Sequence, residues 1–333
     1  MPRLFRPRVL PVAKQPLSTK SWEVLKSFDD QLSERETAST TPYGDLRQFL
    51  DQVPRRQRGV EYVERVVCLY GTKKMKGPRC YSLVQQMRER RFAAGEAELF
   101  ADFEKRLSDA IHPYHLTFHG YNIPFKDRET EAISDELRDI IASIEALGHV
   151  VFINSGTLLG AVRDHAFILH DDDVDLAVIL PATCDKDVLS AHYGLHDELT
   201  AMPDLVIDEK FSSKSPVLKI QTTSGLTVDI FPAWWIDNRL QVWPHTRGEL
   251  DRSDVLPLGR ENIGGISFPT PRKPEKMLAV NYGAKWREPD PHFSFDWRGA
   301  RERFRPVIKQ YRRDRLRDQC LQSLRFFRNT KPN

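Results

Sequence analysis

The sequence predicts an α+β protein in which a small mixed β-sheet flanked by helices follows a mainly helical N-terminal region. Three observations lead to this fold class. Residues 22–111 carry five segments with the apolar spacing of amphipathic helices. Short runs rich in β-branched residues occur at 150–153, 173–180 and 226–232. Between the first two runs, a small-residue turn opens a further helix.

The N-terminal region is expected to be irregular up to about Lys20, because this stretch is basic and rich in proline. Helices are then predicted for residues 22–32, 44–53, 60–70, 81–92 and 95–111. Residues 112–125 contain two prolines and are interpreted as a connector.

The clearest helix comes next. Ile133, Leu137, Ile140, Ile141, Ile144 and Leu147 lie at helical spacing, and Gly148 is a suitable residue to end the helix. The run 150–153 then predicts the first core strand, and Asn154 to Gly156 breaks it so that a helix can run from Thr157 to Arg163.

Two later strands bring carboxylates to the sheet. Asp173 and Asp175 point to one face of the strand 173–180, because alternate side chains of a strand share a face. Asp229 lies in the strand 226–232 and completes the set if the two strands are neighbours. Adjacent carboxylates repel one another unless a cation offsets the repulsion. Mg²⁺ or Mn²⁺ is therefore the expected cofactor, held by Asp173, Asp175 and Asp229.

The turn before the helix 157–163 is a candidate phosphate site. Free backbone N–H groups at a helix N-terminus favour an anion, so Ser155, Gly156 and Thr157 are the predicted phosphate-side residues. Arg163 and Lys219 are further candidates for phosphate contacts. The alternatives are that Arg163 pairs with a charge at the helix end and that Lys219 only occupies a strand face.

Beyond Asp229, residues 234–236 and 240–243 predict a hairpin and residues 266–268 a short strand. A helix begun by Pro274 and ended by Gly283 is also expected.

Several of these motifs, in this order, resemble the LicD family, which includes the fukutin-related proteins. They are Ser-Gly-Thr-Leu-Leu-Gly-Ala-Val-Arg at 155–163, Asp-Asp-Asp-Val-Asp at 171–175, Val-Asp-Ile-Phe-Pro at 228–232 and Asn-Tyr-Gly-Ala-Lys-Trp at 281–286. The resemblance extends over residues 128–291.

The resemblance implies a nucleotidyltransferase-like fold and a metal-dependent transfer of a phosphorylated alcohol, such as phosphocholine or ribitol phosphate. The donor is a CDP-linked alcohol, the acceptor is a glycan hydroxyl, and CMP is released. Asp173 and Asp175 match the paired metal carboxylates of the family, and Gly156 and Thr157 match the phosphate-side turn. Asp229 matches the later carboxylate, which either completes the metal coordination or takes the acceptor proton. His170 stands where the family usually has Trp. Cell-surface polysaccharide biosynthesis is the implied setting.

Two other functions remain open. A nucleotidyltransferase would use the same metal chemistry on an NTP and release pyrophosphate. A non-catalytic scaffold for glycan assembly would keep the fold and dock through its N-terminal helices or its basic C-terminus.

Composition sets the remaining expectations. The 333 residues have a net charge of +3 and no apolar run of transmembrane length, and four cysteines suit a reducing compartment, so a cytoplasmic protein is expected. The predicted regions are 1–125 (helical), 126–300 (catalytic) and 301–333 (a basic amphipathic helix or tail).

The last region holds eleven Lys or Arg against three Asp or Glu. It could dock at the inner face of the membrane or on a glycan-assembly partner, or it could pack on the domain. Nucleic acid is not an expected partner, because no nucleic-acid motif accompanies the charge.

Overall fold

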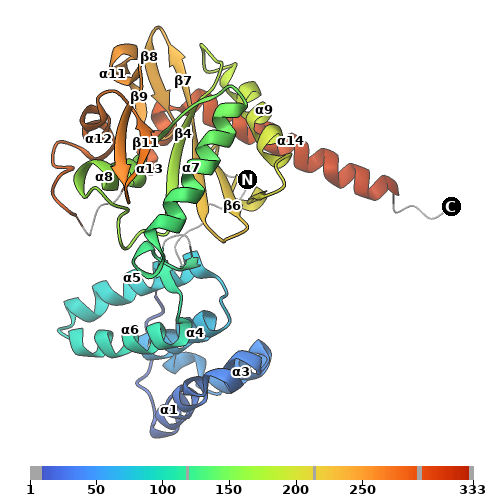
Figure 1. The fold of residues 1–333 in the computed structure, drawn as a ribbon. Helices are drawn as coiled ribbons and strands as arrows, with labels where there is room; N and C mark the ends of the chain where they lie inside the picture. Colours follow the sequence, from blue (N-terminus) through green and yellow to red (C-terminus); the bar gives the residue numbers. More distant parts are fainter. Residues whose placement is uncertain (1–9, 118–119, 213–214, 291–294, 330–333) are drawn as a thin grey trace. The chain divides into compact units, whose positions relative to one another are not determined.

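The computed structural model describes residues 10–117, 120–212, 215–290 and 295–329, apart from the side chains of 210–211 and 318–329. The chain divides into two compact units, Met1–Pro124 and Phe125–Asn333. Figure 1 shows both units along the chain. Each unit has its own hydrophobic core.

The first unit is helical, as predicted, and its helices bury one apolar face each. Leu25 and Phe28 of the first helix, Val67 and Leu69 of the fourth and Phe103 of the sixth are fully buried in a common core. The helices are α1 (Thr19–Ser33), α2 (Arg35–Thr40), α3 (Tyr43–Leu50), α4 (Val60–Thr72), α5 (Gly77–Ala93) and α6 (Ala97–Ile111), with a 3-10 turn η1 at Arg55–Gln57.

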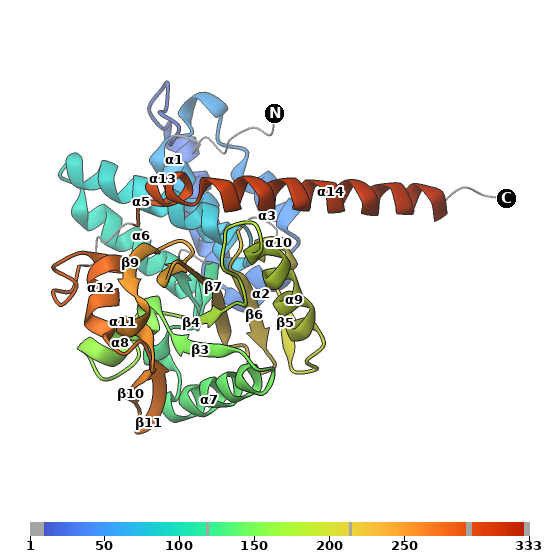
Figure 2. The ribbon, with the colours of Figure 1, turned by 90° about the horizontal axis from the view of Figure 1, so that it is seen from above.

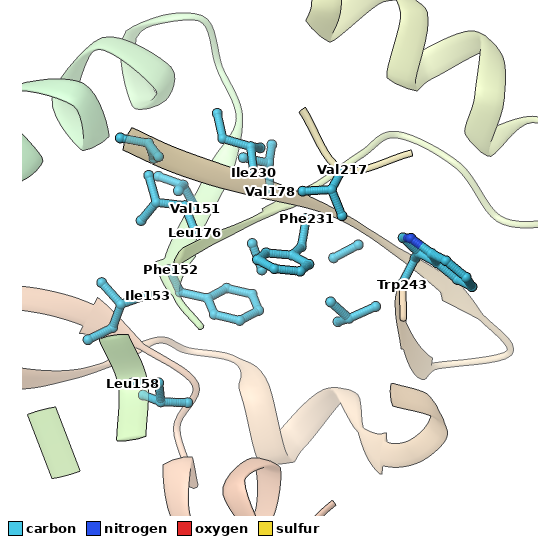
Figure 3. Packing of buried hydrophobic residues seen from close by; sticks show 14 of the residues in the cluster. Val151, Phe152, Ile153, Leu158, Leu176, Val178, Val217, Ile230, Phe231 and Trp243 are labelled. Carbon is cyan, nitrogen blue, oxygen red and sulfur yellow. The ribbon is translucent and has the colours of Figure 1, made fainter. Parts of the chain in front are cut away.

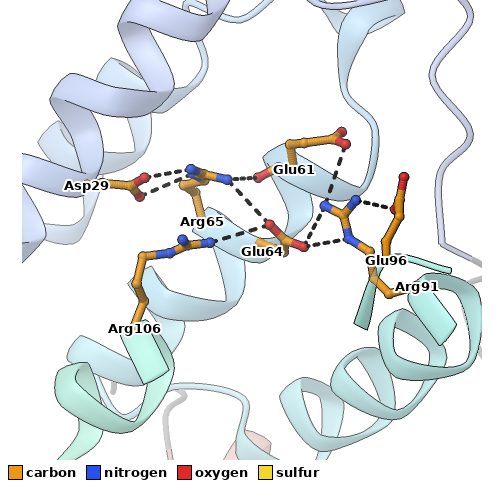
Figure 4. Close-up of polar contacts among 7 residues, drawn as sticks. All are labelled: Asp29, Glu61, Glu64, Arg65, Arg91, Glu96 and Arg106. Carbon is orange, nitrogen blue, oxygen red and sulfur yellow. Dashed lines mark hydrogen bonds and ion pairs between the residues drawn. The ribbon is translucent and has the colours of Figure 1, made fainter. Parts of the chain in front are cut away.

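A buried ion network ties the helices of this unit together. The Glu64 carboxylate on α4 is 2.9 Å from Arg91 Nη2, 3.4 Å from Arg65 Nη1 and 3.5 Å from Arg106 Nη2. Arg65 also pairs with Asp29 on α1 at 2.6 Å (Figure 4). One carboxylate therefore links α4 to α5 and α6, while Arg65 extends the network to α1.

The connector prediction is wrong in one respect. Within residues 112–125 the chain forms an antiparallel pair, β1 (His115–Thr117) and β2 (Gly120–Asn122), followed by the 3-10 turn η2 at Phe125–Asp127. The two prolines lie outside the paired residues, so they leave the short ladder intact.

The second unit is a seven-stranded mixed sheet with helices around it (Figures 1 and 2). Its central strands run in the order β3-β4-β7-β6-β5, and β8 and β9 continue from β7. Among the described strands, β4 and β7 form a parallel pair, and the other pairs are antiparallel. The strands are β3 (Val150–Ile153), β4 (Asp173–Ile179), β5 (Leu205–Ile207), β6 (Leu218–Thr222), β7 (Thr227–Ile236), β8 (Arg239–Val242) and β9 (Thr246–Asp251).

The helices of this unit pack against the sheet and against each other. Helix α7 covers β3 with the predicted isoleucine face, whereas Leu147 lies past its end and is 39% exposed. The helices are α7 (Thr130–Ala146), α8 (Ser155–Arg163), α9 (Val188–Thr200), α10 (Glu209–Ser212), α11 (Arg252–Val255), α12 (Pro274–Tyr282), α13 (Trp297–Arg303) and α14 (Arg305–Asn329). A separate hairpin consists of β10 (Gly259–Ile263) and β11 (Ile266–Thr270).

The core explains why these strands pair as they do. Val151, Ile153 and Leu176 pack with Ile230 in one fully buried cluster (Figure 3). Because side chains alternate along a strand, burying these residues on one face of the sheet directs the residues between them to the other face.

Strand β7 is longer than predicted and continues through Pro232 to Ile236. Pro232 has no N–H to donate, but its carbonyl accepts a hydrogen bond from Trp243 N at 3.2 Å. The strand therefore changes its hydrogen-bonding partner strand at this point. The predicted hairpin then follows, with Asp237 and Asn238 at φ values of +47° and +59° in its turn.

The start of α14 belongs to the core. Four residues at this point of the chain are buried, namely Phe304, Val307, Ile308 and Tyr311. The ring centroid of Tyr311 lies 5.9 Å from that of His192 on α9. Farther along, Leu316 is 58% exposed. Part of the predicted basic tail, namely the side chains of 318–329 and all of 330–333, lies outside the described residues.

Among the described residues, no helix is both long enough and apolar enough to cross a bilayer.

Candidate active site

A row of polar side chains crosses the centre of the sheet. Asp175 of β4 is the Cα partner of Asp229 in the parallel β4–β7 ladder, and Asp229 is the partner of Lys219 in the antiparallel β6–β7 ladder. Residues opposite one another in a ladder share a face. Asp173 lies two positions before Asp175 and therefore joins them. The structure thus brings together the three carboxylates that the sequence predicted.

The row extends to the end of β3. The Asn154 N–H donates to Asp175 O at 2.9 Å, which continues the β3–β4 ladder one residue past Ile153. The Asn154 side chain is fully buried, and among the described residues neither Oδ1 nor Nδ2 has a hydrogen-bond partner. A buried amide without partners costs about 1–3 kcal/mol. Sequence reasoning treated Asn154 only as a strand breaker and missed it as a site residue.

Lys219 is paired with the carboxylates. Its Nζ lies 3.2 Å from Asp229 Oδ1 and 3.4 Å from Asp173 Oδ2, and the residue is 8% exposed. Burial lowers the pKa of Lys219, but Asp229 and Asp173 outweigh burial and hold this pKa above its ordinary value. The ammonium is thus a resident positive charge within the carboxylate row.

The acidic turn before β4 adds two carboxylates. One oxygen from each of Asp171, Asp172 and Asp173 lies within 4.8 Å of the others. Burial, and then the neighbouring carboxylates, raise the pKa values of Asp171 and Asp175 well above the ordinary value. Asp171 and Asp172, which directly precede strand β4, thus lie beside Asp173.

Helix α8 is joined to this cluster at its first turn. The Gly156 N–H donates to Asp175 Oδ2 at 2.7 Å, and the Asp175 N–H donates to Thr157 Oγ1 at 2.8 Å. A Cβ at position 156 would lie 2.7 Å from Asp171 Oδ2 and 3.1 Å from Asp175 Oδ2. A side chain at this position would therefore displace at least one of the two carboxylates, because both lie close to the Gly156 backbone.

This arrangement changes the interpretation of the helix mouth. The Gly156 N–H, expected to bind a phosphate, binds the Asp175 carboxylate. Ser155 has a φ of +42°, a conformation that a residue with a Cβ rarely adopts. Its Oγ lies 3.5 Å from His245 Nδ1. His245 follows the hairpin, and no pattern in the sequence singled it out.

Arg163, the other predicted phosphate contact, lies at the end of α8. Its guanidinium makes two hydrogen bonds to the carboxylate of Asp164, at 2.7 and 2.9 Å. Tyr282 of α12 interacts electrostatically with Arg163 and with the carboxylates of Asp175 and Asp171. Burial raises the pKa of Tyr282 well above its ordinary value, with smaller contributions from Asp175 and Asp171 in the same direction.

The donor set fits a hard divalent cation. Aspartate oxygens are the ligands that Mg²⁺ and Mn²⁺ prefer. Among the described residues, the carboxylate oxygens that converge to within 4.8 Å of one another come from Asp171, Asp172 and Asp173. Asp175 and Asp229 lie on the same sheet face as Asp173, as partners in the β4–β7 ladder. Burial is the main cause of the raised pKa values of Asp171 and Asp175, and repulsion from the neighbouring carboxylates is the second; a bound cation would offset both.

Comparison with known families confirms the predicted resemblance. Residues 148–273 match the family model described as LicD/FKTN/FKRP, nucleotidyltransferase domain. This segment contains the turn at 155–157, the acidic run and Asp229. The first unit lies outside the match.

Among curated proteins, the chain is similar to an uncharacterized protein of Caenorhabditis elegans, T07A5.1. The two are 28% identical over 192 residues, which cover 51% of this chain and 45% of the relative. The match thus spans less than half of that protein.

Two solved structures of ANT(2'')-Ia also match. The crystal structure in complex with adenylyl-2''-tobramycin is 13% identical, covers 56% of this chain and 99% of that chain, and has a TM-score of 0.33. The solution structure is 14% identical, covers 60% of this chain and 100% of that chain, and has a TM-score of 0.31.

Proposed function

We propose that the protein is a metal-dependent transferase that moves a phosphorylated alcohol from a CDP-linked donor to a hydroxyl of a glycan, because residues 148–273 match the LicD/FKTN/FKRP nucleotidyltransferase-domain model. The observation that carries this proposal is the polar row of Asp175, Asp229 and Lys219 across three strands, with Asp173 beside it. A chain that only served as a scaffold would gain nothing from burying these carboxylates together, since their mutual repulsion is destabilising.

The proposed reaction is an in-line displacement at the phosphorus that carries the alcohol. The acceptor oxygen forms a new P–O bond, the P–O bond to CMP breaks, and the acceptor proton is lost to a base. Asp173, Asp175 and Asp229 would hold Mg²⁺ or Mn²⁺, which when bound supplies positive charge for the phosphoryl oxygens.

Asp229 is better suited to a ligand role than to the role of base. An ammonium 3.2 Å from its Oδ1 stabilises the ionised carboxylate and so weakens it as a proton acceptor. Asp175 is also held as an acceptor, by the Gly156 N–H. Both carboxylates are therefore fixed in direction before any ligand arrives.

The donor phosphates are proposed to lie beside the α8 turn. Ser155, Gly156 and Thr157 would line this site, and Lys219 and Arg163 would supply positive charge to the phosphates. Arg163 must exchange its Asp164 partner for a phosphate oxygen in this role.

The cellular setting proposed here is cell-surface polysaccharide biosynthesis on the cytoplasmic side of the membrane. The basic residues from Arg301 onward would then contact the anionic inner face or a glycan-assembly partner.

The test is a product assay with purified protein and Mg²⁺ or Mn²⁺. CDP-choline, CDP-ribitol and CDP-glycerol are each offered with glycan acceptors, and CMP and the modified glycan are followed by mass spectrometry. Release of CMP with one donor supports the proposal and identifies the alcohol. Release of pyrophosphate from an NTP would instead identify a nucleotidyltransferase, and no turnover with any donor or NTP would favour the scaffold.

A further inference from the structure

We propose that Lys219 is a built-in counter-ion that competes with the divalent metal for Asp173 and Asp229, and so sets how tightly the site binds metal. This inference rests on the proposed function, because it takes these carboxylates as metal ligands. It adds a second role for Lys219 to the donor-phosphate contact proposed above, namely pairing with the carboxylates while no metal is bound.

The ammonium lies between two of the carboxylates that are proposed to bind the metal. Nζ contacts Asp229 Oδ1 at 3.2 Å and Asp173 Oδ2 at 3.4 Å, so it bridges carboxylates from two different strands. A Mg²⁺ ion bound to these oxygens would lie about 2.1 Å from each. A metal ion bound to both oxygens and an ammonium in its present position would be two cations in nearly the same space.

The backbone of Lys219 is held in place, so the exchange must occur through its side chain. Lys219 pairs with Asp229 in the β6–β7 ladder. On the other edge of β6, the Lys219 carbonyl accepts from Asp208 N at 2.7 Å and its N–H donates to Ser212 Oγ at 3.3 Å. The four-carbon stem can swing the ammonium away while the strand stays fixed.

The energetic consequence follows from the surrounding charge. Asp171, Asp172, Asp173, Asp175 and Asp229 form a group of five carboxylates that Lys219 partly neutralises. With the ammonium present, the site keeps its shape without metal, and an incoming ion must displace one positive charge. Removing that charge should make the metal-free protein less stable and should make the metal bind more tightly.

The experiment compares Mn²⁺ binding by the wild type, Lys219→Met and Lys219→Arg, measured by calorimetry and by the electron paramagnetic resonance signal of free Mn²⁺. Methionine keeps the apolar stem and removes the charge, whereas arginine keeps the charge. Lys276→Met is the matched control, because Lys276 pairs with the buried Asp254 away from the carboxylate row.

We expect Lys219→Met to bind Mn²⁺ at least about tenfold more tightly, the ratio that 1.4 kcal/mol produces. Its thermal midpoint without metal should fall, and saturating Mn²⁺ should remove the difference from wild type. Lys219→Arg should keep a dissociation constant close to that of wild type. Lys276→Met should lose stability with no change in Mn²⁺ affinity.

Equal or weaker Mn²⁺ binding by Lys219→Met, with wild-type binding intact, overturns this inference and leaves the proposed function standing. If neither the wild type nor any variant binds Mn²⁺, the metal role of the carboxylates fails, and both proposals fall with it.

Discussion

The Asp175 carboxylate and the Gly156 backbone are joined by a hydrogen bond of 2.7 Å, which fixes the first turn of α8 to the central strand β4. The return bond from the Asp175 N–H to Thr157 Oγ1 makes the link reciprocal. The orientation of this carboxylate is therefore set by the helix, and the helix position is set by the carboxylate.

Gly156→Ala should reduce activity far more than stability. The new Cβ would meet Asp171 Oδ2 at 2.7 Å, and a carboxylate end can rotate away, so the metal ligands move while the core is preserved. We expect an unfolding free energy within about 1 kcal/mol of wild type and a large loss of Mn²⁺ affinity. Calorimetry and chemical denaturation measure the two effects.

Gly160→Ala is the matched control in the same helix. Its Cβ would lie 2.4 Å from the backbone oxygen of Ala166, which cannot rotate away. We expect a loss of about 1–3 kcal/mol of stability from this clash. Equal stability losses for Gly156→Ala and Gly160→Ala would contradict the distinction.

Asp175→Asn and Asp229→Asn should abolish transfer without unfolding the protein. Asparagine keeps the size of the side chain, and its Oδ1 can still accept the Gly156 N–H. Because burial, and then the neighbouring carboxylates, raise the pKa of Asp175, removing its charge should leave the thermal midpoint equal or higher. Circular dichroism melting and the product assay test this, and near-normal turnover in either variant would refute the assignment.

Glu64→Gln should destabilise the helical N-terminal unit. Glutamine carries no charge, so the buried Arg91 guanidinium loses its ion pair with Glu64, in which the two groups are 2.9 Å apart. Breaking a buried ion pair costs about 3–5 kcal/mol. Hydrogen exchange of α4 and α5 should show faster opening. Asp109→Asn removes an exposed ion pair with Lys105 and should cost less than about 1 kcal/mol, so similar effects of the two changes would contradict the role of Glu64.

His192 should make the second unit sensitive to acid. Burial, with smaller contributions from Arg315 and His196, lowers the pKa of His192 from 6.5 to about 3. Between these two values the unfolded chain binds a proton that the folded chain does not, so stability falls as the pH drops. From pH 7 to pH 5 the loss is about 2 kcal/mol.

The measurement is urea unfolding of wild type and His192→Leu at pH 7 and pH 5. Leucine carries no proton, so this contribution to the pH dependence should disappear. An unchanged difference between the two pH values would show that other groups cause it.

Local signals in the sequence predicted the elements that carry the carboxylates. The strands around Asp173, Asp175 and Asp229 and the helix from Thr157 follow from alternation and from a small-residue turn. The pairing of the strands could not be predicted in this way, because the pattern of one strand does not identify the strand beside it. That Lys219 stands opposite Asp229 depends on β6 joining the sheet, and β6 was not predicted.

The phosphate prediction shows the same limit. A turn with free N–H groups predicts an anion, and the sequence does not distinguish a ligand phosphate from a carboxylate of the protein itself. In the structure the Gly156 N–H binds Asp175. Asn154 and His245 were missed because their importance arises only from the sheet that places them.

The parallel pairing of β4 with β7 also has a consequence for synthesis of the chain. Between Ile179 and Thr227 the chain must make α9, β5, α10 and β6 before the second half of the polar row exists. When a nascent chain has been synthesised only as far as Asp175, its acidic turn is present but Lys219 and Asp229 are not. The row is therefore completed by β7, the last of its strands to be synthesised, and the proposed metal site is complete only after the sheet has assembled.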